Sequence, residues 1–366
     1  MKFSALLLST AAALSGALVG CRGADLTGPD AAGELAWRPI AVVGIQGLEG
    51  ASLRGLSVPQ DEVVWVSGSN GLVLRSIDGG ASWSDVSPTE ARRDALDARS
   101  LVALDAERAW IATAGPGSAS RILKTTNGGR AWTTVRTNRE PQGFYNALRM
   151  WNGTNGLVMG DAVDGRLTLL RTADGGESWE RLGPEGFPRT VEGEVGFAGS
   201  NRSLARLGAR RAWLGTGGAQ ARVWSTDDRG RTWTATHLPL QQGDEGAGVF
   251  ALAFRDERHG VAVGGNYTLP DRRGGTAAKT DDGGRSWLRS EVPPGGYRSS
   301  VAPAPDRAGL WLAVGINGTD VTWDDGRTWE PIGAGRGIEL NAVAFAPSGR
   351  FAWAVGPDGR ICRLAL

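Results

Sequence analysis

Acidic side chains that could act in catalysis are few, and they cluster in the middle of the chain. Asp161, Asp164 and Glu194 are the set that we would nominate for hydrolysis of a glycosidic bond. That reaction needs two opposed carboxyl groups, one acting as an acid and the other as a base or nucleophile. A glycoside hydrolase that uses Asp161 or Asp164 facing Glu194 is therefore our alternative hypothesis for function.

Metal and cofactor chemistry find little support in the residue types. The two histidines, His237 and His259, lie in different repeats, whereas zinc needs three or four converging ligands. The glycine-rich stretches Gly215–Gly218 and Arg273–Gly275 lack the strand-then-helix context of a phosphate-binding loop. No Gly-x-Ser-x-Gly elbow precedes a helix. We expect no metal, no cofactor and no catalytic serine.

Six copies of an eight-residue pattern, S/T-x-D/N-x-G-x-S/T/A-W, organise the chain. Their tryptophans recur at intervals of 49, 47, 54, 54 and 42 residues. In each copy, Asp or Asn can accept hydrogen bonds from its own turn, Gly supplies a positive φ, and Trp can pack between sheets. We interpret the pattern as a structural hairpin turn between short strands, so its aspartates are poor catalytic candidates. The copies are Ser76–Trp83, Thr125–Trp132, Thr172–Trp179, Thr226–Trp233, Thr280–Trp287 and Thr322–Trp329.

Four β-rich runs surround the first copy, which is the composition of one propeller blade. The chain stops after Gly359–Leu364, which has a third-strand pattern, where a seventh copy would begin. At the other end, Leu35–Ile40 resembles the strand that follows a repeat. We expect this N-terminal strand to complete the C-terminal blade, because that arrangement leaves no unpaired blade. The sequence predicts an all-β, seven-bladed β-propeller over residues 35–366.

The first strand of each propeller blade lines the central channel, and ligands bind at a channel mouth. Aligning these strands places polar groups in equivalent positions and assigns Glu194 to the fourth blade. Such groups can also hydrogen-bond to one another and to channel water, so both hypotheses stay open. The aligned residues are Arg54, Ser100, Asn146, Glu194, Phe250, Arg298 or Ser299, and Asn341. The candidate ligand- or partner-binding residues are Arg54, Asn146, Asp161, Asp164, Arg166, Glu194, Asn266, Tyr267, Tyr297 and Arg298.

The repeats resemble the Asp-box of BNR-repeat propellers, which occur in sialidases, sortilin-type receptors and bacterial secreted proteins. Ser52–Ser57, Val64–Gly71 and Ser76–Gly80 are similar to the photosystem II assembly and stability factor propellers and their bacterial "oxidoreductase-like" secreted relatives. The resemblance runs from about Leu35 to Leu366. It implies a scaffold that assists assembly of a membrane protein. A sialidase would need an arginine triad and a Tyr–Glu pair, and no Arg-Ile-Pro segment precedes the first repeat.

The first twenty residues have the features of an export signal. Lys2 is followed by the apolar stretch Ala5–Val19, which is too short to span a bilayer. The segment Leu18–Cys21 resembles the lipobox of bacterial lipoproteins, which implies cleavage before Cys21 and acylation of that residue. We expect a signal peptide at 1–20 and a flexible tether at 21–34. Arg22 follows the cysteine, so we expect the periplasmic face of the outer membrane or the cell surface.

Charge and cysteine content limit the possible partners. Lys2 is the only charged residue of the signal segment, so the remainder carries 39 basic and 39 acidic residues. This balance argues against nucleic acid or a bulk electrostatic grip on lipid. Apart from the lipidated Cys21, Cys362 is the only cysteine, so we expect no internal disulfide in the mature domain. We expect a monomeric, non-catalytic binding scaffold with a protein partner, possible glycan binding, and membrane attachment through lipid alone.

Overall fold

The computed structural model describes residues 35–183, 185–187, 189–333 and 337–366. The expected signal peptide, the lipidated Cys21 and the tether lie outside the described residues. In the part of the chain that is described, no helix has the length and apolar character needed to cross a bilayer.

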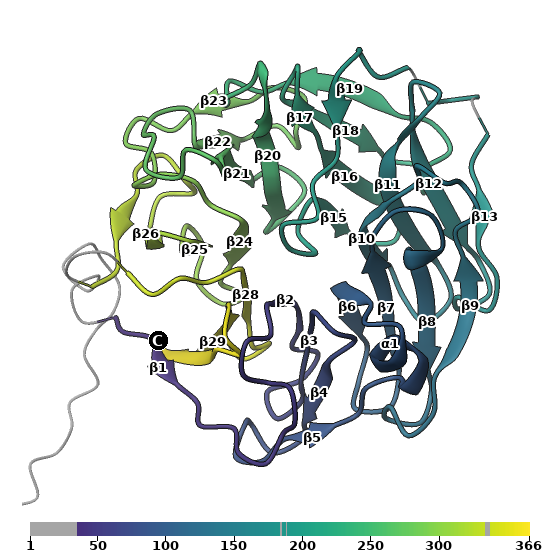
Figure 1. The fold of residues 1–366 in the computed structure, drawn as a ribbon. Helices are drawn as coiled ribbons and strands as arrows, with labels where there is room; N and C mark the ends of the chain where they lie inside the picture. Colours follow the sequence, from purple (N-terminus) through teal and green to yellow (C-terminus); the bar gives the residue numbers. More distant parts are fainter. Residues whose placement is uncertain (1–34, 184, 188, 334–336) are drawn as a thin grey trace, which may run out of the picture.

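The described strands form seven antiparallel sheets arranged around a central axis, with the first strand of each blade innermost (Figure 1). This is the seven-bladed propeller that the repeats predict. The first three blades are β2 (Leu53–Ser57), β3 (Val64–Gly68), β4 (Val73–Ser76), β5 (Ser84–Asp85); β6 (Asp97–Ala103), β7 (Ala109–Ala114), β8 (Arg121–Thr125), β9 (Thr133–Thr137); and β10 (Tyr145–Met150), β11 (Gly156–Val163), β12 (Arg166–Thr172), β13 (Glu180–Arg181). The fourth to sixth are β15 (Leu204–Leu207), β16 (Arg211–Gly215), β18 (Arg222–Thr226), β19 (Thr234–His237); β20 (Asp244–Phe254), β21 (Gly260–Asn266), β22 (Ala277–Thr280), β23 (Leu288–Arg289); and β24 (Ser300–Pro303), β25 (Trp311–Gly315), β26 (Gly318–Thr322), β27 (Glu330–Pro331). Two short helical turns, α1 (Thr89–Arg93) and a 3₁₀ turn at Gly117–Ala119, lie in loops.

The N-terminal strand closes the ring, as predicted. The seventh blade contains β28 (Ala342–Phe345), β29 (Phe351–Val355) and β30 (Ile361–Ala365), and β1 (Arg38–Pro39) pairs with the outer edge of β30. The Nε1 atom of Trp37 donates to the hydroxyl of Thr319 at 3.0 Å, which ties this strand to the sixth blade as well. The two ends of the propeller chain therefore stabilise one blade together (Figure 1).

Each Asp-box is a self-contained hydrogen-bonded turn. In the first copy, the hydroxyl of Ser76 donates to Asp78 at 2.8 Å and accepts the backbone N–H of Gly80 at 2.8 Å. The carboxylate of Asp78 also accepts the backbone N–H of Ser82 at 2.9 Å. The side-chain and backbone hydrogen bonds from Ser82 lower the pKa of Asp78 to about 2. The box carboxylates are therefore held by their own turns, as expected for structural residues.

The second glycine of the box is required because the neighbouring blade packs against it. A Cβ atom at Gly80 would lie 2.3 Å from the Trp353 ring of the preceding blade. The same relation joins Gly176 to Trp110 and Gly284 to Trp213, with Cβ approaches of 2.4 and 2.9 Å. A buried tryptophan of one blade therefore lies beneath the box of the next, which couples the local turn to packing between blades.

The fifth sheet differs from a four-stranded blade and corrects one assignment made from the sequence. Two extra strands, β14 (Glu194–Val195) and β17 (Gly217–Gly218), extend it beyond β20 in the order β14-β17-β20. Glu194 therefore lies in this extension, and the innermost strand of the fourth blade is β15 instead. The sequence alignment failed here because the chain makes an excursion before the fourth blade begins.

Residues 196–202, which we call the channel segment, run through the middle of the ring. The amide of Asn201 donates to the Leu101 carbonyl at 2.9 Å, and the hydroxyl of Ser200 donates to the Ser299 carbonyl at 2.8 Å. The channel segment thus crosses the central channel and separates its two mouths. Hydrogen bonds join this segment to all six other blades through Arg54, Leu101, Leu148, Leu252, Ser299 and Val343.

Candidate functional site

Two cavities lie at opposite ends of the inner strands. One, of about 370 Å³, is lined by residues at or before the strand starts, and we call it the aromatic mouth. The other, of about 380 Å³, is lined by residues at the strand ends, and we call it the arginine mouth. Both volumes are in the range of small-ligand sites. The channel segment contributes to both, with Phe197 lining the first and Arg202 the second.

The aromatic mouth brings together half of the sequence-predicted binding residues. These are Arg54, Asn146, Asp161, Tyr267 and Tyr297. The aligned strand positions Phe250, Ser299 and Asn341 also line it, which supports the alignment outside the fourth blade. Residues that the sequence reasoning missed are Arg99, Phe144, Phe197 and Ile316.

Asp161 is the carboxylate of the aromatic mouth. It accepts a 2.7 Å hydrogen bond from the Asn146 amide and another from the backbone N–H of Gly196. Burial raises the pKa of the carboxyl above its ordinary value in spite of these bonds. Gly196 must lack a side chain, because a Cβ there would lie 2.2 Å from the Asn146 amide nitrogen. The channel segment thus holds the Asp161 carboxyl in place, and burial favours its protonated form.

Glu194 lies elsewhere and is fully committed to local structure. Its side chain has no exposed surface and forms an ion pair with Arg222. The same carboxylate accepts hydrogen bonds from the hydroxyl of Thr216 at 2.6 Å and from Nε1 of Trp224 at 3.1 Å. The group anchors the β14–β17 extension to the fourth blade.

Asp164 and Arg166 line a third cavity, of about 380 Å³, on the side of the third blade. Asp164 occupies the β11–β12 turn with a φ of 55°. The three carboxylates nominated for glycoside hydrolysis are thus distributed over three separate environments. No two of them line the same cavity, whereas this chemistry needs an opposed pair.

Arg298 and Asn266 are buried side chains with structural partners. The guanidinium of Arg298 is 3% exposed and forms an ion pair with Asp320, while also binding Asn317 and the Tyr297 carbonyl. The Asn266 carbonyl oxygen accepts hydrogen bonds from the backbone N–H and hydroxyl of Thr268, at 2.9 and 2.8 Å. Neither residue lines the aromatic mouth.

The arginine mouth was not anticipated from the sequence. Arg149, Arg202 and Arg206 line it, and among the described residues its lining contains no Asp or Glu. None of the three forms an ion pair with another described residue. Arg149 donates to the Leu148 carbonyl at 3.1 Å and Arg202 to the Val343 carbonyl at 3.2 Å. The cluster therefore carries positive charge that carbonyl dipoles alone offset.

The surroundings of these arginines oppose their charge. Burial lowers the pKa of Arg202 to about 10. Burial, together with the charges of Arg202 and Arg206, lowers the pKa of Arg149 well below its ordinary value. Burial also lowers the pKa of Arg206. A base whose pKa falls on folding destabilises the folded state while it stays protonated. The available signal was Arg149 itself, a charged residue within the inner strand β10.

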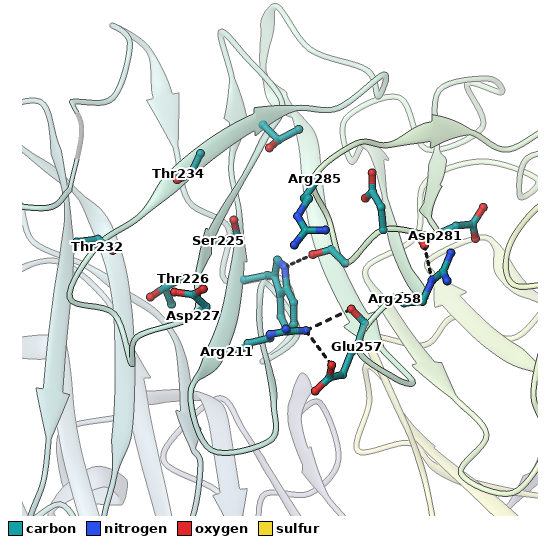
Figure 2. Close-up of a pocket in the computed structure, with 14 residues that line it drawn as sticks. Arg211, Ser225, Thr226, Asp227, Thr232, Thr234, Glu257, Arg258, Asp281 and Arg285 are labelled. Atoms are coloured by element: carbon teal, nitrogen blue, oxygen red, sulfur yellow. Dashed lines mark hydrogen bonds and ion pairs between the residues drawn. The ribbon is translucent and has the colours of Figure 1, made fainter.

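A larger cavity, of about 690 Å³, lies between the fourth and fifth blades and is polar (Figure 2). Arg211 forms an ion pair with Glu257 at 3.7 Å, and Arg258 donates to the Asp281 carbonyl at 3.1 Å. Its charged side chains thus face one another across the joint between the blades. We interpret this groove as part of the packing of the ring rather than as a ligand site.

No cluster of three or more His, Cys, Asp or Glu side chains suited to a metal ion occurs among the described residues. Cys362 is buried in β30, and burial raises the pKa of its thiol to about 11. A thiol in this environment is unreactive at neutral pH.

Comparison with known proteins connects this geometry to one group of propellers. No protein-family model matches the chain. It is 26% identical over 263 residues to the photosystem II assembly lipoprotein Ycf48 of Synechococcus sp. (strain CC9902), an alignment that covers 62% of this chain and 71% of that protein.

Solved structures agree on the architecture. YCF48 bound to D1 peptide superposes with a TM-score of 0.63 at 17% identity, covering 90% of this chain and 97% of that one. The GH74 enzyme of Niastella koreensis superposes with a TM-score of 0.61 at 16% identity, and the superposition covers 53% of the enzyme's chain. The second likeness shows that an enzyme can share the fold, and at this identity it shows nothing more. Taken with the sequence match, these similarities make the chain a Ycf48-like β-propeller, related to the photosystem II assembly factors by distant homology.

Proposed function

We propose that this chain is a non-catalytic scaffold that captures an acidic segment of a protein partner at the arginine mouth. The observation that carries the proposal is the set of three arginines, Arg149, Arg202 and Arg206, in one cavity whose described lining has no carboxylate. Guanidinium groups bind carboxylates through paired, charge-assisted hydrogen bonds. An acidic partner supplies the negative charge that the chain itself lacks there.

The shape of the site favours a peptide. Apart from Ser57, the other residues of the lining are apolar, among them Leu56, Leu101, Leu252 and Phe345. An extended segment with acidic and apolar side chains would therefore find partners for both. The cavity is preformed by rigid inner strands, and a preformed site avoids much of the ordering cost of binding.

The relatives support a protein partner. One is named for photosystem II assembly, and a solved YCF48 structure is named as bound to a D1 peptide. This chain would carry out the same type of task, namely capture of one polypeptide segment during assembly. The identity of that segment follows from chemistry here: it is acidic, and it reaches the end of the propeller channel.

We also propose that a lipid on Cys21 holds the propeller close to a membrane. The relative named as an assembly lipoprotein supports this, together with the lipobox-like Leu18–Cys21. Two or more acyl chains would make the attachment stable. The expected location is the periplasmic face of an outer membrane or the cell surface. Metabolic labelling with a palmitate analogue tests this, since Cys21→Ser should remove the label.

Fluorescence anisotropy with a labelled glutamate-rich peptide tests peptide capture. We expect the combined variant R149Q/R202Q/R206Q to weaken binding at least about a hundredfold, because each charge-assisted contact is worth about tenfold or more. Binding should also weaken steeply with salt, and the glutamine version of the peptide should bind poorly.

Arg258→Gln in the groove between blades is the matched control, because it removes an arginine from a different surface. It should leave the affinity for the peptide within about twofold, as expected of a charge remote from the site. Equal loss in the control and the combined variant would mean that the peptide responds only to net charge. In that case the arginine mouth would not be the binding site.

A further inference from the structure

The aromatic mouth has a rigid apolar wall. Phe197 stacks on Phe250 with ring centroids 3.8 Å apart, and Tyr297 packs edge-on against Phe250 at 4.8 Å. Two glycines fix the position of Phe197: a Cβ at Gly217 or Gly248 would lie 2.5 or 2.9 Å from its ring. This wall is therefore set by backbone contacts before any ligand arrives.

Two side chains at this mouth, Arg54 and Tyr297, can donate further hydrogen bonds to a ligand. Arg54 is half-buried, forms no ion pair with the described residues, and donates to the Gly199 carbonyl at 2.8 Å. Burial, followed by the charge of Arg99, lowers the pKa of Arg54. The side chain of Tyr297 is also buried, with 4% of the residue exposed, and its hydroxyl has no hydrogen-bond partner among the described residues. Both donors line the cavity and can therefore be reached by a molecule bound in it.

Charge at the two ends of the cavity is complementary. Arg99 is neutralised by Asp97 at 2.7 Å, so Arg54 carries the uncompensated positive charge. Among the described residues, Asp161 has no cationic partner, and its carboxylate accepts hydrogen bonds from the Asn146 amide and the Gly196 N–H. Arg54 and Asp161 do not pair with each other although both line the cavity. Their arrangement suits one molecule with an acceptor at one end and a donor at the other.

We propose that the aromatic mouth binds a small aromatic carboxylate that carries a hydrogen-bond donor at its far end. Its carboxylate accepts hydrogen bonds from Arg54 and the Tyr297 hydroxyl, its ring packs against Phe197, and its far donor reaches Asp161. A single negative charge matches the single free guanidinium. The volume of about 370 Å³ accommodates a molecule of this size. This site is separate from peptide capture, since it lies at the other end of the channel.

Titration calorimetry on the full chain with four probes tests the proposal: phenylacetate, 4-hydroxyphenylacetate, phenylacetamide and inorganic phosphate. We expect phenylacetate to bind about tenfold more tightly than phenylacetamide, because the amide has no charge to offer Arg54. The 4-hydroxy compound should bind about threefold more tightly again through Asp161. Inorganic phosphate should not compete. Equal binding of acid and amide, or no binding of either, would overturn the proposal.

Three variants locate the site. Arg54→Gln should remove about tenfold of the affinity for phenylacetate, and Tyr297→Phe about threefold, as expected for a charged and a neutral hydrogen bond. Asp161→Asn should remove the preference for 4-hydroxyphenylacetate and leave the phenylacetate affinity in place. Arg206→Gln, at the arginine mouth, is the control and should change neither affinity.

The tyrosine and aspartate variants keep the test independent of folding, because Arg54 also holds Gly199 and its loss could disturb the channel segment. The ligand would lie elsewhere, and the proposal would be refuted, if Tyr297→Phe left the affinity for phenylacetate unchanged and Asp161→Asn left the preference for 4-hydroxyphenylacetate unchanged. A negative result here leaves peptide capture at the arginine mouth intact, whereas loss of peptide binding alone would refute only the proposed function.

Discussion

Replacing Arg202 by Met should make the propeller more stable and the scaffold less able to bind an acidic peptide. Methionine keeps the apolar stem of the side chain and removes its charge. Burial lowers the pKa of Arg202 from its ordinary value to about 10, so keeping the group protonated costs free energy at neutral pH. That cost is fully present below pH 10 and disappears only as the pH rises towards the ordinary pKa of arginine.

The magnitude follows from these values. Each pKa unit corresponds to about 1.4 kcal/mol, which makes the cost about 3 kcal/mol before solvent screening. Water in the arginine mouth reduces this to about half. The variant also loses the hydrogen bond to the Val343 carbonyl, which subtracts about 1 kcal/mol from the gain in stability. We therefore expect Arg202→Met to raise the free energy of unfolding slightly, by less than about 1 kcal/mol at neutral pH.

Urea unfolding at neutral pH, followed by tryptophan fluorescence, measures the effect. Arg222→Met is the matched control, because Arg222 pairs with the buried carboxylate of Glu194. Its removal leaves that charge unpaired and should lower stability by about 3–5 kcal/mol. Opposite signs in the two variants would identify Arg202 as a residue retained for binding. If Arg202→Met destabilises as well, the arginine serves the fold, and the reasoning about the arginine mouth fails.

Three further outcomes are expected. Gly80→Ala should destabilise the fold by about 3 kcal/mol or more, because the added methyl group overpacks against the neighbouring blade. Gly79 has open space around it, so Gly79→Ala should cost only about 1 kcal/mol for the positive φ at that position. Thermal melts of the two variants, run side by side, compare them. Glu194→Gln should lower the urea midpoint, because Arg222 loses its partner, yet leave peptide affinity within about twofold; a large affinity loss would restore Glu194 as a binding residue. Asp161→Asn should raise stability at neutral pH but not at pH 3, because burial raises the pKa of this acid and its charged form is the disfavoured one; equal effects at both pH values would contradict this.

Much of the fold was accessible from the sequence because its determinants are local. Each Asp-box satisfies its own backbone, as the hydrogen bonds that Asp78 accepts from Ser82 show. The repeat spacing and the incomplete seventh unit then fix the number of blades. The pairing of Arg38 with Arg363 in β1 and β30 confirms the predicted closure.

The candidate sites were predicted less completely, and the reason is visible at the fourth blade. The alignment assumed one inner strand per repeat, but residues 194–202 leave the blade, pair with the fifth sheet and then cross the channel. Glu194 was consequently assigned to the channel when it belongs to a buried ion pair. The aromatic mouth was found in part, because Arg54, Asn146 and Asn341 follow the regular repeat.

The sequence by itself determined the blades, their turns and the closure of the ring, since hydrogen bonding within a turn and alternation along a strand act over a few residues. Tertiary structure alone decided which side chains share a cavity. Arg149 and Arg202 meet because the channel segment carries the second arginine across the ring to the first. Their convergence depends on contacts between residues far apart in the chain, and such contacts leave no periodic trace in the sequence.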